Sequence, residues 1–303
     1  MAPPTSAFRG FSARSIATDR GSVFVREGGR GPALLLLHGF PETSLMWHAV
    51  APLLAADFAV VAADLPGYGE SSCPADGPDH SSMSKREMAV TLVEAMKAAG
   101  HERFAVLGHD RGGRVAYRAA LDHPDRITRV AVLDVIPTYE VWDRADVRLA
   151  LSFWPFSLLA QPAPLPERLL AAAPDAIIDN AITEWGSSPD AFPAWVREAY
   201  VDALGDPDHV HAICEEYRAA AGMDREIDKA DLNAGRRIAC PLLALWSEEG
   251  ALANWYGDDG GPLGLWRRWA DDVRGQAVAG GHFFPEAQPA QTAALIKDFL
   301  GQG

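Results

Sequence analysis

Short apolar runs alternate with helical patterns over the first 136 residues, and this alternation restricts the fold more than any other feature. Strand candidates lie at VFVRE (23–27), ALLLL (33–37), FAVVAAD (58–64), FAVLGH (104–109) and ITRVAVLD (127–134). The last four are almost continuously hydrophobic, which is typical of strands that are covered on both faces. Because strands that alternate with helices form a mostly parallel sheet, the sequence predicts an α/β core.

Two helices are predicted between these runs, over residues 85–99 and 111–122. Ser84 is a favourable N-cap for the first helix, and Gly100 ends it. Strand patterns return late in the chain, at PLLALW (241–246) and AVAGGHFF (277–284), and a last amphipathic helix is predicted over roughly 287–300.

A long segment without any strand-like run separates the two groups of strands. It is rich in proline and tryptophan and contains helical pieces such as IIDNAITEWG and AWVREAYVDAL. Prolines at this density indicate many short elements joined by turns. We therefore predict a first part of the core over residues 1–136, an inserted helical cap over 137–235, and a second part of the core over 236–303.

Charge and cysteine content narrow the class of protein. The net charge of −14 and the pI of about 5.0 argue against nucleic acid or an anionic membrane as a partner. The three cysteines form no CxxC pair and no cluster with histidine, which favours a reducing compartment and gives no metal site. The N-terminal residues lack the features of a signal peptide, and no apolar run is long enough to span a bilayer. We expect a soluble cytoplasmic protein without metal or cofactor.

The strand candidate FAVLGH leads directly into Gly108-His109-Asp110-Arg111-Gly112 and then into a predicted helix. A G-x-nucleophile-x-G sequence at such a turn is the nucleophile elbow of α/β hydrolases, which presents its central side chain at the carboxyl end of the sheet. The two glycines permit the tight turn and the close approach of its neighbours. The nucleophile position holds an aspartate here, where a serine is more usual.

The elbow also predicts where its catalytic partners lie, because the chain order in these hydrolases is nucleophile, acid, histidine. Asp134 ends the next strand, and His282 follows the last strand candidate. Glu248 or Glu249, after the 241–246 strand, is an alternative acid. The sequence thus predicts an Asp110-His282 pair completed by a second carboxylate.

The motif HGFPE at 38–42 follows an apolar strand, where the oxyanion loop belongs. We expect the backbone N–H groups of Phe40 and Arg111 to form the oxyanion hole. Three further histidines, His38, His109 and His123, are interpreted as structural.

Seven motifs resemble those of the haloacetate and fluoroacetate dehalogenases of the α/β-hydrolase fold: HGFPE, DLPGYGES, GHDRGGR, LDVIPTY, AQPAPLPE, EEYRAA and GGHFFPE. The resemblance covers nearly the whole chain, from about residue 8 to about residue 300. DLPGYG and GHD are shared with epoxide hydrolases and haloalkane dehalogenases, whereas GHDRGGR and AQPAPLPE point to the haloacetate group. The resemblance implies a mostly parallel eight-stranded sheet flanked by helices, an inserted all-helical cap, and a homodimer.

The chemistry of an aspartate nucleophile agrees with this resemblance. A carboxylate that displaces halide from a saturated carbon forms an alkyl ester, which water can later hydrolyse, whereas a serine would form a stable ether. His282, oriented by Asp134, would activate the water that attacks the Asp110 ester. For a haloacetate the products would be halide and glycolate.

Arg111 and Arg114 follow the nucleophile within one helical turn. Their i, i+3 spacing places both on one face of the helix, and arginine is well suited to bind a carboxylate. Two cations in the first turn of a helix are unfavourable unless an anion binds there. We therefore expect both to hold the carboxylate of a small anionic 2-haloacid.

The halide pocket departs from the family pattern. In the resembling family a His-Trp pair precedes the AQPAPLPE-like segment and forms the halide pocket with a tyrosine, but Pro155 and Phe156 replace that pair here. Tyr217 and Trp185 match the cap positions of the family, and the indole of the adjacent Trp154 is a candidate replacement donor. Because fluoride depends most on hydrogen bonding as it leaves, we expect chloro- and bromoacetate to be favoured over fluoroacetate.

Two other functions remain open. An epoxide hydrolase would use the same triad together with two cap tyrosines, for which Tyr139, Tyr200 and Tyr217 are candidates, but it gives no reason for the two arginines. A non-catalytic ligand sensor on this fold would have no use for a complete triad. The sequence does not decide whether the glycine- and acid-rich segment 247–263 is ordered or mobile.

Overall fold

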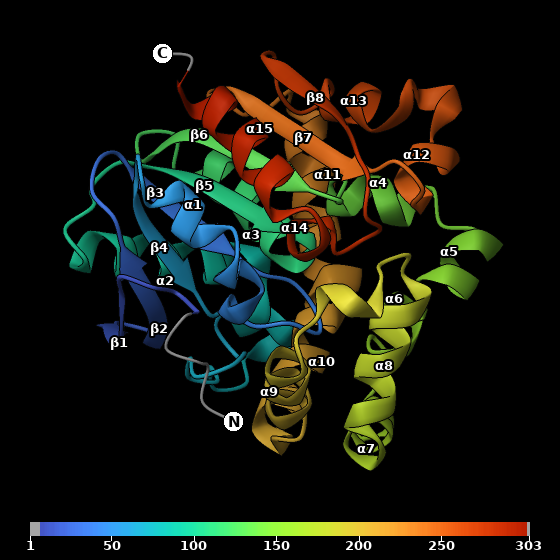
Figure 1. Cartoon of the computed structure of the whole chain (residues 1–303). Coiled ribbons are helices and arrows are strands. Elements are labelled where there is room, and N and C mark those ends of the chain that lie inside the picture. The colour runs from blue at the N-terminus through green and yellow to red at the C-terminus, as the bar shows by residue number, and fades with distance from the viewer. Residues whose placement is uncertain (1–6, 302–303) are drawn as a thin grey trace.

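A single sheet forms the centre of the protein in the computed structural model, which describes residues 7–301 (Figure 1). Within these residues eight strands are arranged in the order β1-β2-β4-β3-β5-β6-β7-β8. All neighbours from β4 to β8 are parallel, whereas β2 is antiparallel to both β1 and β4. The predicted α/β class and the mostly parallel eight-stranded sheet are confirmed. The strands are β1 (Phe11–Thr18), β2 (Gly21–Gly28), β3 (Ala33–Leu37), β4 (Ala59–Ala63), β5 (Phe104–His109), β6 (Ile127–Leu133), β7 (Leu242–Ser247) and β8 (Val273–Val278).

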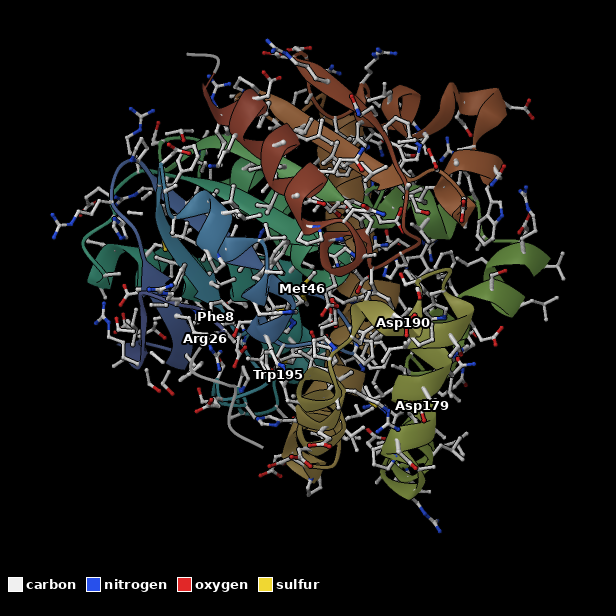
Figure 2. All side chains as sticks on the ribbon, in the orientation of Figure 1. Phe8, Arg26, Met46, Asp179, Asp190 and Trp195 are labelled. Carbon is white, nitrogen blue, oxygen red and sulfur yellow. The ribbon has the colours of Figure 1, made fainter. Side chains whose placement is uncertain are left out.

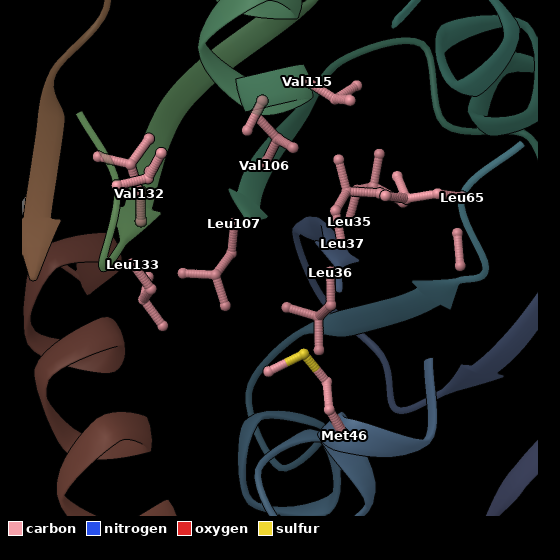
Figure 3. Close-up of a cluster of buried hydrophobic side chains, with 14 of the residues drawn as sticks. Leu35, Leu36, Leu37, Met46, Leu65, Val106, Leu107, Val115, Val132 and Leu133 are labelled. Carbon is pink, nitrogen blue, oxygen red and sulfur yellow. The ribbon is translucent and has the colours of Figure 1, made fainter. Parts of the chain in front are cut away.

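The central strands are buried on both faces, as their continuous apolar sequences indicate. Leu35 of β3 is paired in register with Val106 of β5, and the next pair along the strands, Leu36 and Leu107, points to the opposite face. Figure 3 shows both sets, with Met46 packed below Leu36. Because each buried leucine or valine contributes about 1.5–3 kcal/mol, these strands provide much of the stability of the core.

Both edges of the sheet differ from the sequence-based expectation. The strand predicted over 277–284 is wrong, because β8 covers Val273–Val278 and the chain turns away at Gly280 and Gly281, whose φ angles are 115° and 72°. The strand β1 was not predicted at all. Both edge strands expose every second residue or more, so neither contains a continuous apolar run.

Helices cover both faces of the sheet (Figure 1). Ser84 caps α2, since its side chain accepts a hydrogen bond from the backbone N–H of Glu87. The segment 247–263 is ordered into short helices. None of the helices described within residues 7–301 is long and apolar enough to cross a membrane. The helices of the core are α1 (Ala51–Leu54), α2 (Lys85–Ala98), α3 (Asp110–Asp122), α12 (Ala251–Trp255), α13 (Gly261–Trp266), α14 (Phe284–Ala287) and α15 (Pro289–Gly301).

The chain between β6 and β7 contains helices and turns, and no strand among its described residues. Figure 1 shows α6 to α10 projecting beyond the sheet as a separate layer. Trp195 of α9 packs edge-on against His48 of η1 (Ser44–His48), where this layer meets the core (Figure 2). The helices are α4 (Thr138–Asp143), α5 (Val147–Ser152), α6 (Trp154–Leu158), α7 (Leu165–Ala172), α8 (Pro174–Glu184), α9 (Ala194–Leu204), α10 (Pro207–Ala219) and α11 (Arg225–Asn233).

Four sequence-based expectations are not decided by this fold. The cap boundaries at residues 137 and 235 stay predictions, as do the homodimer and the cytoplasmic location. Residues 1–6, the beginning of the segment for which we predict no signal peptide, lie outside the described residues.

The turn between β5 and α3 depends on close backbone contacts. Gly108 pairs with Leu37 of β3 and with Val132 of β6, so it lies between two strands. A Cβ atom at Gly108 would collide with the backbone of Gly112, and one at Gly112 would collide with the carbonyl oxygens of Leu37 and His38. The turn is therefore compatible only with glycine at both positions.

Replacing Gly108 by alanine should destabilise the protein, because the added methyl group meets rigid backbone rather than a movable side chain. We expect the free energy of unfolding to fall by about 3 kcal/mol, measured by urea denaturation. Gly222→Ala is the matched control, since its Cβ meets nothing within 4 Å, and it should change the same quantity by less than about 0.5 kcal/mol. Equal losses in the two variants would contradict the steric argument.

Candidate active site

Three side chains with catalytic potential meet at the carboxyl edge of the sheet. Asp110 directly follows β5, Asp134 directly follows β6, and His282 lies four residues beyond the end of β8. Since these strands are parallel, their carboxyl ends share one edge, and the three side chains line one cavity. Asp110 and Asp134 adopt positive φ angles of 43° and 50°, a conformation that costs about 1–3 kcal/mol for a non-glycine residue and that the surrounding contacts must hold.

Asp134 is the acid that contacts the histidine. Its Oδ2 lies 2.6 Å from Nδ1 of His282, and its Oδ1 accepts a hydrogen bond of 2.9 Å from the backbone N–H of Ser247. The alternative acid Glu249 lines only an outer hollow, described below, and Glu248 lines neither space. With Nδ1 held by Asp134, Nε2 of His282 is left to face a ligand.

The oxyanion loop lies against the nucleophile. The backbone N–H of Phe40 donates to Oδ1 of Asp110 over 3.0 Å. Glycine at position 39 permits this approach, because a Cβ there would lie 2.5 Å from the Cβ of Asp110. The backbone N–H of Arg111 belongs to the first turn of α3, where N–H groups have no partner within the helix.

The environment of Asp110 favours the ionised carboxylate. Burial alone would raise its pKa, but the electrostatic effects of His282, Arg111 and Arg114 together outweigh burial, so the pKa lies below its ordinary value. An ionised carboxylate at the tip of the elbow is the form that a nucleophile requires.

The cavity next to Asp110 is small. The centres of water molecules fit within a volume of about 40 Å³ there, so the cavity has room for about three waters. A larger outer hollow of about 290 Å³ adjoins it and shares Asp134, Phe153, Trp185 and His282 with it. Apart from its polar groups the inner cavity has an apolar wall made of Val135, Ile136, Val141, Leu149, Phe153 and Leu252.

Arg114 is a buried cation that lines this cavity. Only 4% of its surface is exposed, and its Nη1 donates to the carbonyl of Ile136 and to the hydroxyl of Thr138, over 3.1 and 3.2 Å. Among the described residues no carboxylate forms an ion pair with it, and its Nε is buried without a hydrogen-bond partner. Burial, followed by repulsion from Arg111, lowers the pKa of Arg114. The charge is therefore available for an anion in the cavity.

Arg111 is placed differently from Arg114. Its Nε and Nη2 contact the Glu216 carboxylate at 2.7 and 2.5 Å, and the Tyr217 ring lies 3.9 Å from its Cζ. Burial alone would lower the pKa of Arg111, but the charge of Glu216 raises it above its ordinary value. Arg114 lines the cavity and Arg111 does not, although both guanidinium groups lie over the Phe156 ring, with Cζ 5.2 and 5.7 Å from its centroid. The role of Arg111 in binding a carboxylate stays a prediction.

The residues predicted for the halide pocket also divide into two groups. Tyr217, Trp185, Phe156 and Pro155 line the cavity, whereas Trp154 does not. The indole N–H of Trp154 donates to Oδ1 of Asn180 over 3.0 Å, so this donor is already used within the cap. Tyr217 and Trp185 remain as side-chain donors from the cap.

The tyrosines considered for an epoxide hydrolase are dispersed. The hydroxyl of Tyr200 donates to Glu286, and that of Tyr139 donates to Asp143 at the surface. Of the three candidates only Tyr217 lines the cavity. Sequence reasoning missed another tyrosine, Tyr256, which lines the cavity from the segment 247–263. The signal in the sequence that could have indicated Tyr256 was its position after β7, a strand whose carboxyl end lies at the same edge of the sheet as Asp110 and Asp134.

A second unforeseen feature lies behind the histidine. His109 Nε2 is 2.9 Å from the carbonyl oxygen of His282, and His109 Nδ1 is 3.1 Å from a carboxyl oxygen of Glu42. Glu42 in turn lies close enough to Glu286 for each carboxyl group to shift the pKa of the other, and Glu286 accepts a hydrogen bond from Tyr200. The two glutamates end the repeated F-P-E sequences of HGFPE and GGHFFPE, and this repetition was the signal in the sequence. The structural interpretation of His109 agrees with these contacts.

The buried glutamate pair must hold a proton. Burial raises the pKa of Glu42 to about 7, and burial together with the charge of Glu42 raises that of Glu286 well above its ordinary value. Glu42 Oε1 and Glu286 Oε2 are buried without a hydrogen-bond partner among the described residues, which favours a proton on one of the two carboxyl groups. The folded protein therefore retains protons that the unfolded chain releases.

Glu42→Gln should change the pH dependence of stability. A carboxyl group whose pKa is raised on folding stabilises the folded state fully at pH values below the unfolded pKa of about 4.5. This stabilisation is lost as the pH rises through about 7. Glutamine cannot lose a proton, so the variant should gain stability relative to the wild type by about 1 kcal/mol per pH unit between pH 5 and 7. Urea denaturation at several pH values measures this difference. The exposed Glu226→Gln is the control, and its difference in stability from the wild type should not depend on pH. If the difference for Glu42→Gln is also independent of pH, a proton held by the glutamate pair is contradicted.

Comparison with known proteins agrees with the fold and the site. Residues 32–158 match the model of the alpha/beta hydrolase fold. The chain is 41% identical to a fluoroacetate dehalogenase of Burkholderia sp over 294 residues, which are 97% of this chain and 95% of that protein. It is 31% identical to a soluble epoxide hydrolase of Corynebacterium sp. (strain C12), over 86% of this chain and 87% of that protein.

Among solved structures, a Nostoc sp PCC 7120 protein provisionally described as an alpha/beta hydrolase superposes with a TM-score of 0.94 and 42% identity, over 98% of this chain and 100% of that chain. The elbow, the triad geometry and a relative at 41% identity over almost the full length agree. The chain is a hydrolase that belongs to the haloacetate and fluoroacetate dehalogenase family of the α/β-hydrolase fold.

Proposed function

We propose that the protein hydrolyses the carbon–halogen bond of small 2-haloacids, with haloacetates as the main substrates. The observation that carries the proposal is the buried Arg114, which has no carboxylate partner among residues 7–301 and lines the same small cavity as Asp110 and His282. An unpaired buried charge costs several kcal/mol, so a site that contains one is suited to a ligand of opposite charge. The 41% identity to a fluoroacetate dehalogenase supports the same class of substrate.

The first step is displacement of the halide. The ionised carboxylate of Asp110 attacks the carbon that carries the halogen, a C–O bond forms, and the halide leaves with the electron pair of the broken bond. Arg114 offsets the repulsion between the substrate carboxylate and Asp110, which would oppose the approach in a cavity of low dielectric constant. Tyr217 and Trp185 supply the cap donors for the departing halide.

The second step is hydrolysis of the Asp110 ester. His282 accepts a proton from water through Nε2, while Asp134 holds Nδ1 and stabilises the imidazolium. The hydroxide attacks the ester carbonyl, and the backbone N–H of Phe40 donates to the oxygen on which negative charge develops. Collapse of this intermediate releases a 2-hydroxy acid, glycolate in the case of a haloacetate, and restores the carboxylate.

The size of the cavity favours short acids. A space for about three waters matches a two-carbon acid with one halogen, whereas longer chains would need displacement of the apolar wall. Pro155 and Phe156 extend this wall where the family has two N–H donors. We therefore infer that the site favours halides that leave readily without much hydrogen bonding.

An epoxide hydrolase is the second candidate. Two tyrosines, Tyr217 and Tyr256, line the cavity and offer hydroxyl groups for an epoxide oxygen, and the 31% identity to a soluble epoxide hydrolase supports the possibility. Tyr256, however, comes from the core segment after β7 and not from the cap. A neutral epoxide also leaves the charge of Arg114 unpaired, so the haloacid is the better match.

A halide-release panel tests the choice of substrate. Chloro- and bromoacetate should be turned over at least about tenfold faster than fluoroacetate, since the loss of one donor to a developing charge costs more than about 1.4 kcal/mol. Ion-selective electrodes measure the three halides, and diol formation from a small epoxide is assayed in parallel. Diol without halide would favour the epoxide hydrolase, and fluoride release equal to chloride release would contradict the inferred halogen preference.

His282→Gln should stop the reaction after the first step. Asp110 still attacks the substrate in this variant, but no base activates the water, so the ester accumulates. Mass spectrometry of the protein after incubation with chloroacetate should show one added carboxymethyl group on the peptide that contains Asp110. Asp110→Asn is the control, because it lacks the nucleophile and should remain unmodified. Modification of any other residue would contradict the assignment of the nucleophile.

A further inference from the structure

Tyr256 belongs neither to the catalytic triad nor to the cap. It directly follows α12 in the segment after β7, and only 6% of its surface is exposed. It lines the inner cavity together with Arg114. A large aromatic residue of the core thus forms part of the wall that faces the ligand.

The hydroxyl of Tyr256 has no hydrogen-bond partner among residues 7–301, although its ring is buried. The hydroxyl oxygen is not completely enclosed by protein atoms, so it faces open space. Because a tyrosine hydroxyl can donate one hydrogen bond, a hydroxyl that faces the cavity without a protein partner is available to a ligand there. The tyrosine therefore offers one donor to a ligand.

The surrounding charges place this donor at one end of the cavity. Burial raises the pKa of Tyr256 to about 12, against the charges of Arg114, Arg144 and Arg148, so the hydroxyl keeps its proton at neutral pH. For Tyr217 the charges of Arg111 and Asp110 have larger effects on the pKa than the charge of Arg114, which is the largest charge effect on Tyr256. Tyr217 thus belongs to the nucleophile side of the cavity, and Tyr256 to the side of Arg114.

We propose that the Tyr256 hydroxyl donates a hydrogen bond to the substrate carboxylate and, together with Arg114, fixes the acid end of the ligand. This inference rests on the proposed function. Nη1 of Arg114 is held by Ile136 and Thr138, whereas Nη2 has no hydrogen-bond partner among the described residues. A carboxylate has two oxygens, and the pair supplies one donor to each. With the acid end held there, the carbon that bears the halogen lies toward Asp110, and the halogen points away from Asp110 to the cap donors such as Tyr217.

The site is then divided between two parts of the chain. The segment after β7 and the helix α3 recognise the carboxylate, and the cap contributes the donors for the halide. Tyr256 acts as a residue that determines specificity for acids, because a neutral ligand gains nothing from a second donor beside Arg114.

Tyr256→Phe tests the proposal, since it removes the hydroxyl and keeps the ring. With chloroacetate as the substrate, we expect KM to rise about tenfold or more, as for the loss of a hydrogen bond to a charged group, and kcat to change by less than about twofold. Tyr139→Phe is the matched control, because the Tyr139 hydroxyl contacts Asp143 outside the cavity, and its kinetic constants should equal those of the wild type. An unchanged KM in Tyr256→Phe, or a loss confined to kcat, would overturn the proposal.

Binding of unreactive anions separates the two ends of the site. Calorimetric titration should show that Tyr256→Phe weakens acetate about tenfold and leaves bromide unchanged, and that Tyr217→Phe does the reverse. Weaker bromide binding in Tyr256→Phe would assign this hydroxyl to the halide and overturn the proposal.

The outcomes also distinguish this inference from the proposed function. If the wild-type protein releases no halide from chloroacetate but Tyr256→Phe still weakens acetate, the carboxylate site stands and dehalogenation is excluded. If halide is released normally and acetate binds equally to both proteins, dehalogenation stands and the role of Tyr256 is excluded.

Discussion

The backbone contact between the β5–α3 turn and the end of β3 is the constraint on which the rest of the site depends. Gly108 and Gly112 let the turn pass so close to Leu37 and His38 that no side chain fits between them. This contact brings Asp110 within 3.0 Å of the Phe40 N–H and holds it at a positive φ angle. Because β6 and β8 run parallel to β5, the same edge then receives Asp134 and, beyond the end of β8, His282. The strained Asp110, which we propose as the nucleophile, is kept in place by the packing of the sheet behind it.

The sequence predicted those elements whose position follows from local patterns and from topology. The buried parallel strands were found because both of their faces are covered, which makes them continuously apolar. The edge strands β1 and β8 were missed or misplaced for the opposite reason, since side chains such as Arg274 and Gln276 face the solvent. The glycines at 280 and 281 read as part of an apolar run, although their positive φ angles end the strand.

The meeting of the three candidate catalytic residues at one edge of the sheet was predicted to the same extent, whereas their roles stay predictions. Chain order was sufficient to choose Asp110, Asp134 and His282, because topology alone brings the ends of parallel strands together. The pairing of Arg111 with Glu216 was not predictable, because 105 residues separate them in the sequence. The helical spacing of Arg111 and Arg114 also gives no information about a carboxylate on α10. Tyr256 was missed for a similar reason, because its segment lacks the periodicity that would have indicated short helices.

The docking of α10 onto the core gives the two arginines different partners among the described residues. Glu216 contacts Arg111, Lys85 and the hydroxyl of Tyr68, and all four groups are buried. This cap residue neutralises the cation nearer to the nucleophile and leaves Arg114 unpaired. If both cations were unpaired, they would bind an anion more strongly but would lower the pKa of Asp110 further, and a less basic carboxylate is a weaker nucleophile. For the proposed dehalogenase, the buried carboxylate of the cap would therefore balance two opposing requirements, attraction of an anionic substrate and reactivity of Asp110.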